Sequence, residues 1–236
     1  MRVKEAIILA GGLGTRLKSA VADLPKCMAP VDGKPFLHYL ITYLQQQGVE
    51  RFIFSLGHLA AAAADYIKAS LPPETYVLVQ EPYPLGTGGA IQLAMQQVKG
   101  KEVWVLNGDS LCNLNLSEQA ELHFQKQALC TLGLVPMKQF DRYGVVTIDN
   151  NHRILGFEEK KWQEQGIINA GIYLLNKSAF QSIPWPEKFS METDFLQAYH
   201  QRLPFYGYVA SAYFLDIGIP EDYQRAQQEL PKYSNA

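Results

Sequence analysis

The order of strands and helices along the first half of the chain restricts the fold more than any other feature. Short apolar runs with the length of buried strands alternate there with longer segments whose apolar residues recur at helical spacing. Such an alternation is typical of a mostly parallel sheet with helices packed on both of its faces. We expect strands at residues 6–9, 51–56, 75–79 and 102–106, and helices at 35–47, 58–71 and 87–98.

The second half of the chain changes to strands joined by short turns, which suit antiparallel neighbours. These strands should therefore extend the parallel sheet into a mixed one. Because no linker, repeat or low-complexity segment interrupts the sequence, we expect a single α/β domain over residues 1–236. The expected strands are 129–135, 144–149, 153–158 and 167–175, and the expected helices are 191–201 and 221–229.

Composition argues against several classes of protein. The 236 residues carry a formal net charge of −2 without a long block of like charge, whereas a nucleic-acid surface normally needs a basic excess. No apolar stretch approaches the roughly 20 residues that cross a bilayer, so no membrane partner is expected. Cys27, Cys112 and Cys130 lie far apart and form no paired zinc or disulfide motif, which favours a reducing, cytoplasmic location.

A glycine-rich loop follows the first expected strand in the segment AIILAGGLGTRL, residues 6–17. Leu17 stands where a dinucleotide-binding fingerprint requires its last Gly or Ala, and where a P-loop requires the Gly before Lys and Ser. Both motifs are therefore excluded. The loop still has the properties of an anion site, because small residues let backbone N–H groups converge on phosphate oxygens and Arg16 can add a fork of donors.

Further segments follow the glycine loop in an order that is typical of one enzyme family. They are LPKCMAPV (24–31), LNGDS (106–110), RYGVV (142–146), FEEK (157–160), NAGIY (169–173) and FLDIGIPEDY (214–223). With these motifs the chain resembles the sugar-phosphate nucleotidyltransferases over nearly its whole length. Members of this family transfer a nucleoside monophosphate from an NTP to a sugar 1-phosphate and release pyrophosphate.

The resemblance implies a Rossmann-like three-layer α/β/α nucleotidyltransferase domain. Residues 1–110 would mainly bind the NTP, and residues 111–236 would mainly bind the sugar phosphate. The short chain and the segment PLGTGGA (84–90) resemble most the D-glycero-α-D-manno-heptose 1-phosphate guanylyltransferases within the family. This implies GTP and a heptose 1-phosphate as the substrates.

Two aspartates are the candidate ligands of a metal ion. Asp109 directly follows the strand expected at 102–106, and open α/β sheets bind ligands at the carboxyl ends of their strands. Asp216 lies in the segment LDIG, shortly before an expected helix. Together they could hold one Mg²⁺, which prefers oxygen ligands and bridges carboxylates to phosphates. The structural alternative is that each is a turn or cap aspartate.

The resemblance implies roles for the remaining site residues. Arg16 and Lys26 would neutralise the NTP phosphates and, with Asp109 and Asp216, make up the catalytic set. Cys27 and Lys161 stand where the family usually has Pro. The implied nucleotide-binding residues are Leu9, Ala10, Gly11, Gly12, Gly14, Thr15, Arg16, Lys26, Glu81, Gly86, Thr87, Asn107 and Gly108, and the implied sugar-phosphate-binding residues are Tyr143, Gly144, Glu159, Lys160, Asn169 and Gly171.

Glu81 is the residue expected to choose the base. A carboxylate can accept hydrogen bonds from the adjacent N1–H and N2–H₂ donors of guanine, whereas thymine or uracil suits an amide better. Its neighbour Gln80 supplies such an amide, which weakens the distinction. Gly86, Thr87 and Gly89 should then open a helix whose N–H groups could meet the base or a phosphate.

Two alternatives to a guanylyltransferase stay open. One is a uridylyl- or thymidylyltransferase that acts on another sugar 1-phosphate, such as a hexose or N-acetylmuramate derivative. The other is a catalytically silent homologue that senses an NDP-sugar, although the presence of all four catalytic residues argues against it. Tyr206, Tyr208 and Tyr213 are expected to be exposed and give a weak indication of a homo-oligomer.

Overall fold

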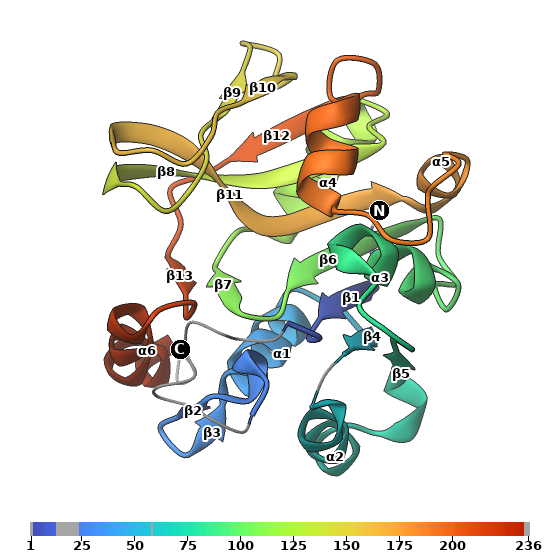
Figure 1. Ribbon diagram of the computed structural model, residues 1–236, viewed down its shortest axis with the longest axis vertical. Coiled ribbons are helices and arrows are strands. Elements are labelled where there is room, and N and C mark those ends of the chain that lie inside the picture. The colour runs from blue at the N-terminus through green and yellow to red at the C-terminus, as the bar shows by residue number, and fades with distance from the viewer. Residues whose placement is uncertain (1, 13–23, 58, 234–236) are drawn as a thin grey trace.

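A seven-stranded sheet with the order β12-β8-β11-β6-β1-β4-β5 forms the centre of the molecule (Figure 1). The structure is a computed structural model that describes residues 2–12, 24–57 and 59–233. Its strands are β1 (Glu5–Leu9), β2 (Pro30–Val31), β3 (Lys34–Pro35), β4 (Arg51–Leu56), β5 (Tyr76–Gln80), β6 (Glu102–Asn107), β7 (Ser110–Cys112), β8 (Cys130–Phe140), β9 (Val146–Ile148), β10 (Ile154–Phe157), β11 (Gln163–Asn176), β12 (Phe205–Val209) and β13 (Phe214–Asp216). Its helices are α1 (Phe36–Gln46), α2 (Ala60–Ser70), α3 (Gly86–Met95), α4 (Leu116–Gln125), α5 (Lys177–Gln181) and α6 (Pro220–Tyr233), with the 3₁₀ turns η1 (Lys26–Met28) and η2 (Pro73–Thr75) and the π-helix η3 (Met191–Gln197).

The strand directions make the sheet mixed and mostly parallel. Strands β6, β1, β4 and β5 are parallel to one another, as the alternating order of the first half predicts. Strand β11 runs antiparallel to both β6 and β8, whereas β12 is parallel to β8. The expected α/β fold is confirmed, but of the long strands added by the second half only β11 is antiparallel to its neighbours.

Helices cover both faces of the sheet and give the molecule three layers. Successive residues of β1 point to opposite faces, because side chains alternate along a strand. Ala6 and Ile8 pack into a core with apolar residues of α1, α2 and α4, while Ile7 packs into a second core with α3, α5 and η3. Because both faces are buried, the central strands are apolar along almost their entire length.

A third apolar cluster joins the beginning and the end of the chain. Ala226 and Leu230 of α6 pack with Val31 of β2, Leu215 of β13 and Leu111 of β7. In Figure 1, α6 lies beside the short β2–β3 hairpin at one end of the molecule. This cluster fixes β13, and with it the end of the strand that carries Asp216.

Several elements differ from the expectation. Helices α4 and α5 and the edge strand β12 are not expected from the sequence, and β8 and β11 extend well beyond the predicted bounds. The helix expected at 191–201 begins as the π-helix η3, and the helix expected at 58–71 begins at Ala60. Helix α4 does carry a recognisable start, because the Asn115 side chain accepts hydrogen bonds from the N–H groups of Ser117 and Glu118.

The three tyrosines that suggested self-association are half-buried rather than exposed: Tyr206, Tyr208 and Tyr213. The first of these rings packs beneath two cations, with Lys126 Nζ 5.9 Å and Arg153 Cζ 5.5 Å from its centroid. These tyrosines therefore make contacts within the chain, and they do not form the exposed aromatic group that suggested a homo-oligomer.

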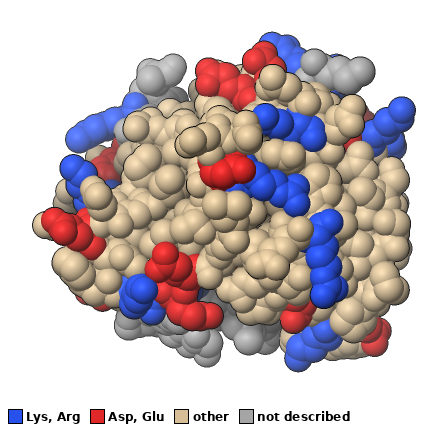
Figure 2. Space-filling model, turned by 90° about the horizontal axis from the view of Figure 1, so that it is seen from above, with Lys and Arg blue, Asp and Glu red and all other residues tan. Residues whose placement is uncertain are grey.

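The surface seen in Figure 2 intersperses positive and negative side chains, and that face carries no extended patch of a single charge. Within the part of the chain that the structure describes, no helix is long and apolar enough to cross a bilayer.

Candidate functional site

Two cavities lie at the carboxyl ends of the central strands and meet at Asp109. The larger, of about 1120 Å³, is lined by the segments that follow β1, β4, β5 and β6. The smaller, of about 290 Å³, is lined by residues of β11 and of the segments around β9, β10 and β13. Lys26, Asn107, Asp109 and Glu192 line both cavities. Their position agrees with the general rule that open α/β sheets bind ligands at the carboxyl ends of strands.

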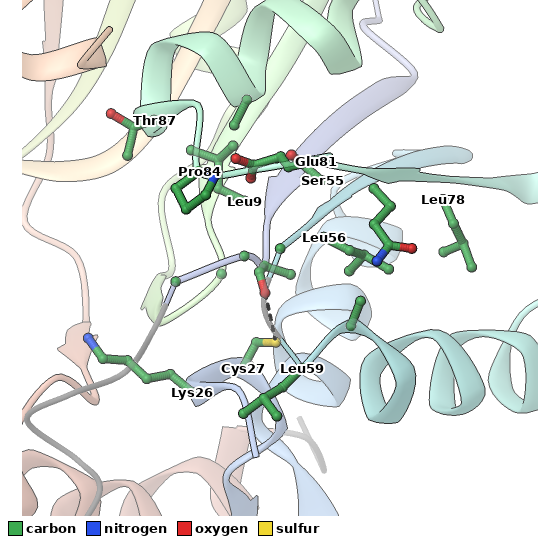
Figure 3. A pocket seen from close by; sticks show the side chains of 18 of the residues that line it. Leu9, Lys26, Cys27, Ser55, Leu56, Leu59, Leu78, Glu81, Pro84 and Thr87 are labelled. Carbon is green, nitrogen blue, oxygen red and sulfur yellow. Dashed lines mark hydrogen bonds between the residues drawn. The ribbon is translucent and has the colours of Figure 1, made fainter. Parts of the chain in front are cut away.

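The large cavity gathers every described residue of the predicted nucleotide-binding set. In Figure 3, Glu81 and Thr87 lie on one side of this cavity, and Lys26 and Cys27 lie on the opposite side. Three further predicted residues, Gly14, Thr15 and Arg16, lie outside the described residues. Those that line the cavity are Leu9, Ala10, Gly11, Gly12, Lys26, Glu81, Gly86, Thr87, Asn107 and Gly108.

Close backbone contacts build the floor of the large cavity. A Cβ atom at Gly11 would lie 2.8 Å from Gly57 N and 2.9 Å from Glu81 Oε1, so no larger residue fits there without a shift. Gly108 donates its N–H to Leu9 O at 2.9 Å, and a Cβ atom at this position would lie 2.5 Å from that oxygen. Glycines therefore allow the segments after β1, β4 and β6 to come together at the cavity.

Glu81 presents one carboxylate oxygen to the large cavity. Its N–H donates to Leu56 O at 2.9 Å, and its Oε2 accepts from the Leu85 N–H at 3.0 Å. Among the described residues, Oε1 has no hydrogen-bond partner. Partial burial raises the pKa of Glu81, and the Leu85 N–H partly offsets that rise. The side chain is thus held by one oxygen and can accept hydrogen bonds with the other.

Local pairing of short strands brings the two candidate metal ligands together. Strand β13 pairs antiparallel with β7 and places Asp216 opposite Ser110. The N–H of Ile217 donates to Asp109 O at 3.0 Å, which holds the two segments side by side. Lys26 Nζ forms an ion pair with Asp109 Oδ2 at 2.9 Å. Two carboxylates and one cation therefore converge where the two cavities meet.

The electrostatics of Asp216 reflect this convergence. Burial raises the pKa of Asp216, and the negative charge of Asp109 raises it further. The Gly218 N–H, which donates to Asp216 Oδ1 at 2.7 Å, and the charges of Lys26 and Arg142 act in the opposite direction. A divalent cation between two carboxylates that repel each other would stabilise both ionised forms.

This donor set fits Mg²⁺. The ion commonly takes one or two carboxylates from a protein and completes its octahedral shell with water and substrate phosphates. The described residues contain no group of three or more His, Cys, Asp and Glu side chains that could hold a metal. Asp109 and Asp216 could hold such an ion.

Cys27 has a packing role. It is 2% exposed, its Sγ donates to Ala10 O at 3.9 Å, and burial raises its pKa to about 12, so the thiol stays protonated. The neighbouring Lys26 begins the 3₁₀ turn η1, directly after Pro25. This turn orients the Lys26 side chain although Cys27 replaces the family's usual proline.

The small cavity gathers the predicted sugar-phosphate-binding residues together with Asp216. Asn169 also makes contacts within the chain: it donates from Nδ2 to Tyr173 Oη at 2.8 Å, and its Oδ1 accepts from the Gly171 N–H at 3.0 Å. Each polar group of Asn169 keeps capacity for one more hydrogen bond, so its sugar-binding role stays a prediction. The predicted residues that line the cavity are Tyr143, Gly144, Glu159, Lys160, Asn169 and Gly171.

The expectation that N–H groups at the start of α3 meet a ligand fails for Gly89. The N–H groups of Gly88 and Gly89 donate to Phe189 O at 3.0 and 3.3 Å, so this turn of the helix does not offer them to a ligand. A Cβ atom at Gly86, where φ is +74°, would lie 2.5 Å from the same oxygen. These contacts fasten α3 to the segment that leads into η3.

Two charged residues of the site were not predicted from the sequence. Arg142 lines the small cavity and donates to Tyr143 Oη at 3.1 Å and to the Asp222 carboxylate. Its place in the motif RYGVV, directly before Tyr143, could have identified it. Glu192 lines both cavities, and no sequence pattern marks it, because it lies in a segment that resembles an ordinary helix.

Residues 5–233 match the family model described as Nucleotidyl transferase. The chain belongs to the nucleotidyl transferase family. The resemblance found in the sequence motifs is therefore confirmed, and this nucleotidyltransferase is an enzyme. The geometry of the paired cavities agrees with a reaction that joins two substrates.

Individual relatives of this nucleotidyltransferase match it over nearly its full length. It is 45% identical over 229 residues to the D-glycero-alpha-D-manno-heptose 1-phosphate guanylyltransferase of Aneurinibacillus thermoaerophilus, covering 97% of this chain and 99% of that protein. The Campylobacter jejuni protein of the same name is 43% identical over 219 residues, covering 93% and 96%. HddC from Yersinia pseudotuberculosis, at 39% identity, gives TM-scores of 0.86 alone and 0.85 in complex with GMP-PN, covering 96% of this chain and 99% of HddC.

Proposed function

We propose that this enzyme transfers GMP from GTP to D-glycero-α-D-manno-heptose 1-phosphate and releases pyrophosphate. The observation that carries the proposal is the meeting of the two cavities at Lys26 and Asp109, next to Asp216 in the wall of the small cavity. Each cavity gathers the residues expected for one substrate. Similarity to two heptose 1-phosphate guanylyltransferases, and to HddC, which was crystallised with GMP-PN, supports the choice of GTP and of a heptose.

The two halves of the chain would divide the substrates between them. Residues 1–110 would mainly bind the nucleotide and residues 111–236 the sugar phosphate, within a single domain. The division is not complete, because Lys26 and Asp109 line the sugar side and Glu192 lines the nucleotide side. We also propose a cytoplasmic location, which the three buried free thiols of Cys27, Cys112 and Cys130 support.

The reaction joins two anions, so the main tasks of the site are charge neutralisation and alignment. A phosphate oxygen of the sugar 1-phosphate attacks the α-phosphorus of GTP. The bond from that phosphorus to the oxygen between the α- and β-phosphates breaks, and pyrophosphate leaves with both electrons of that bond. Lys26 would hold the α-phosphate, Arg16 the phosphates that leave, and Lys160 the phosphate of the sugar.

Asp109 and Asp216 would hold the Mg²⁺ ion, which supplies positive charge to the phosphates when it is bound. Asp109 has a second task, because its Oδ2 holds Lys26 Nζ in place at 2.9 Å. Glu81 would accept the N1–H and N2–H₂ hydrogen bonds of guanine with Oε1, which has no hydrogen-bond partner among the described residues.

The test of this proposal is pyrophosphate release by the wild type and by the Asp109→Asn and Asp216→Asn variants. Release should require Mg²⁺, GTP and heptose 1-phosphate together, and each substitution should lower kcat/KM roughly 100-fold or more, because it removes a metal-ligand charge. Asp216→Asn should fold normally, since burial already disfavours the ionised carboxylate. Asp65→Asn, on the exposed face of α2, is the matched control and should keep wild-type turnover. Release without Mg²⁺, or near-normal turnover in either site variant, would contradict the proposal.

A further inference from the structure

Glu192 occupies a place in the site that none of the roles above uses. It is the second residue of the π-helix η3, it is half-buried, and it lines both cavities. π-Helical turns are rare and occur frequently at functional sites. We propose that Glu192 binds hydroxyl groups of the acceptor sugar and thereby determines which sugar 1-phosphate is used. This inference rests on the proposed function.

The carboxylate of Glu192 is held by one oxygen and free at the other. Its Oε2 accepts hydrogen bonds from Thr87 Oγ1 at 2.9 Å and from Ser190 Oγ at 3.0 Å. Thr87 Oγ1 in turn accepts from the Met191 N–H at 2.8 Å, so the threonine hydroxyl is itself fixed. Oε1 has no hydrogen-bond partner among the described residues. Because each carboxylate oxygen can accept hydrogen bonds, Oε1 is available to a ligand.

Residues near Glu192 in η3 border the small cavity. Leu196 and Gln197, from the same helix, line the small cavity and not the large one. Tyr173 is buried in the wall of the small cavity, and its pKa is raised chiefly by burial and then by the charge of Glu192. The carboxylate therefore lies near the wall of the cavity assigned to the sugar phosphate.

Charge complementarity indicates which part of the substrate Glu192 would bind. Three cations line the small cavity, Lys26, Arg142 and Lys160, and they suit the phosphate of the acceptor. A carboxylate would repel that phosphate but accepts hydrogen bonds from uncharged hydroxyl groups. Glu192 is therefore complementary to uncharged hydroxyl groups of the sugar rather than to its phosphate.

The start of α3 positions both the Glu192 carboxylate and that of Glu81, which is proposed to bind the base. Leu85 donates its N–H to Glu81 Oε2, and two residues later Thr87 donates to Glu192 Oε2. Thr87 thus acts as a positioning residue for Glu192. The structure connects recognition of the two substrates through the start of α3.

The test compares steady-state kinetics of the wild type, Glu192→Gln, Thr87→Val and Thr87→Ser. Hydrogen bonds to charged groups imply that Glu192→Gln lowers kcat/KM for the sugar 1-phosphate about 10- to 100-fold, through KM for the sugar, with KM for GTP changed less than about twofold. Thr87→Val should raise KM for the sugar in the same direction, and Thr87→Ser should recover most of that loss because it restores the hydroxyl. Asp194→Asn, an exposed carboxylate on the same helix that lines neither cavity, is the control and should match the wild type.

A second measurement identifies the contact itself. Monodeoxy analogues of the sugar 1-phosphate should include one that the wild type and Glu192→Gln use equally poorly, because the hydroxyl that Glu192 binds is then absent. An unchanged KM for the sugar in Glu192→Gln, or a KM for GTP that rises in parallel, overturns the proposal. If the wild type prefers another sugar 1-phosphate, the choice of heptose fails separately, and the same comparison with that sugar decides the role of Glu192.

Discussion

At the scale of single residues, the proposed function depends on charged groups whose protonation is set by their neighbours. Asp216 and Glu81 both have raised pKa values, in each case mainly because they are partly removed from water. The physical consequence differs between them. Asp216 faces another carboxylate and suits a cation, whereas Glu81 faces a cavity in which hydrogen-bond donors of a base would be its partners.

The raised pKa of Glu81 predicts that binding of GTP depends on pH. Only the ionised carboxylate can accept both guanine hydrogen bonds, and a raised pKa means that protonation begins at a higher pH than for an ordinary glutamate. We expect KM for GTP to rise as pH falls from neutral toward that raised pKa, with the ionised, GTP-binding form present above it. Initial rates at varied GTP and saturating sugar phosphate, over a series of pH values, measure this effect.

Glu81→Gln provides the matched comparison, because the amide has the same shape but does not titrate. Its KM for GTP should be higher than that of the wild type at neutral pH, and the ratio of the two KM values should shrink as the pH is lowered. A ratio that stays constant over the whole series would show that Glu81 does not read the base as a carboxylate.

At the scale of elements, the joint between α3 and η3 connects the two halves of the site. The carbonyl of Phe189 accepts from the N–H groups of Gly88 and Gly89, and Phe189 N–H donates to Leu85 O at 3.1 Å. Gly86 is required at this joint for two reasons, its left-handed φ of +74° and the 2.5 Å that would separate a Cβ atom from Phe189 O.

Gly86→Ala and Gly33→Ala separate these two reasons. Gly33 has a similar φ of +75°, but a Cβ atom there meets nothing within 4 Å. We expect Gly33→Ala to lower the free energy of unfolding by about 1 kcal/mol from the backbone conformation alone. Gly86→Ala should cost about 1–2 kcal/mol more and should also raise KM for both substrates, because Phe189 must move and η3 follows it. Chemical denaturation and steady-state kinetics measure both effects, and equal losses of stability in the two variants would contradict the role assigned to the joint.

At the scale of the whole molecule, the sequence predicted the parallel half of the fold well. Strands buried on both faces are largely apolar, and β1, β4, β6 and the half-buried edge strand β5 all lie within a residue of their expected bounds. Helix α4 escaped prediction because its buried face includes Gln119 and His123, which are polar in sequence but bond to Thr131 in the structure. Its apolar periodicity is therefore hidden, although the Asn115 cap was visible.

Site residues that directly follow strands could be predicted from the sequence. Site residues that depend on tertiary contacts could not. Asp109 could be placed because it follows β6, and every described site residue of the sequence analysis lines one of the two cavities. The internal bonds of Asn169 and the approach of Glu192 to Thr87 could not be foreseen, because each depends on packing between segments far apart in the chain. Neither leaves a pattern within a single segment.

A competition between nucleotides in a single reaction tests the proposed choice of GTP and heptose 1-phosphate. The wild type is given equal concentrations of GTP, ATP, UTP, CTP and dTTP with Mg²⁺ and D-glycero-α-D-manno-heptose 1-phosphate, and the nucleotide sugars formed are separated and weighed by mass spectrometry. We predict that GDP-heptose forms in large excess over every other product. A predominance of UDP- or dTDP-heptose would show that Glu81 does not select guanine, and a reaction mixture without any nucleotide sugar would contradict the assignment of the two cavities to GTP and a heptose 1-phosphate.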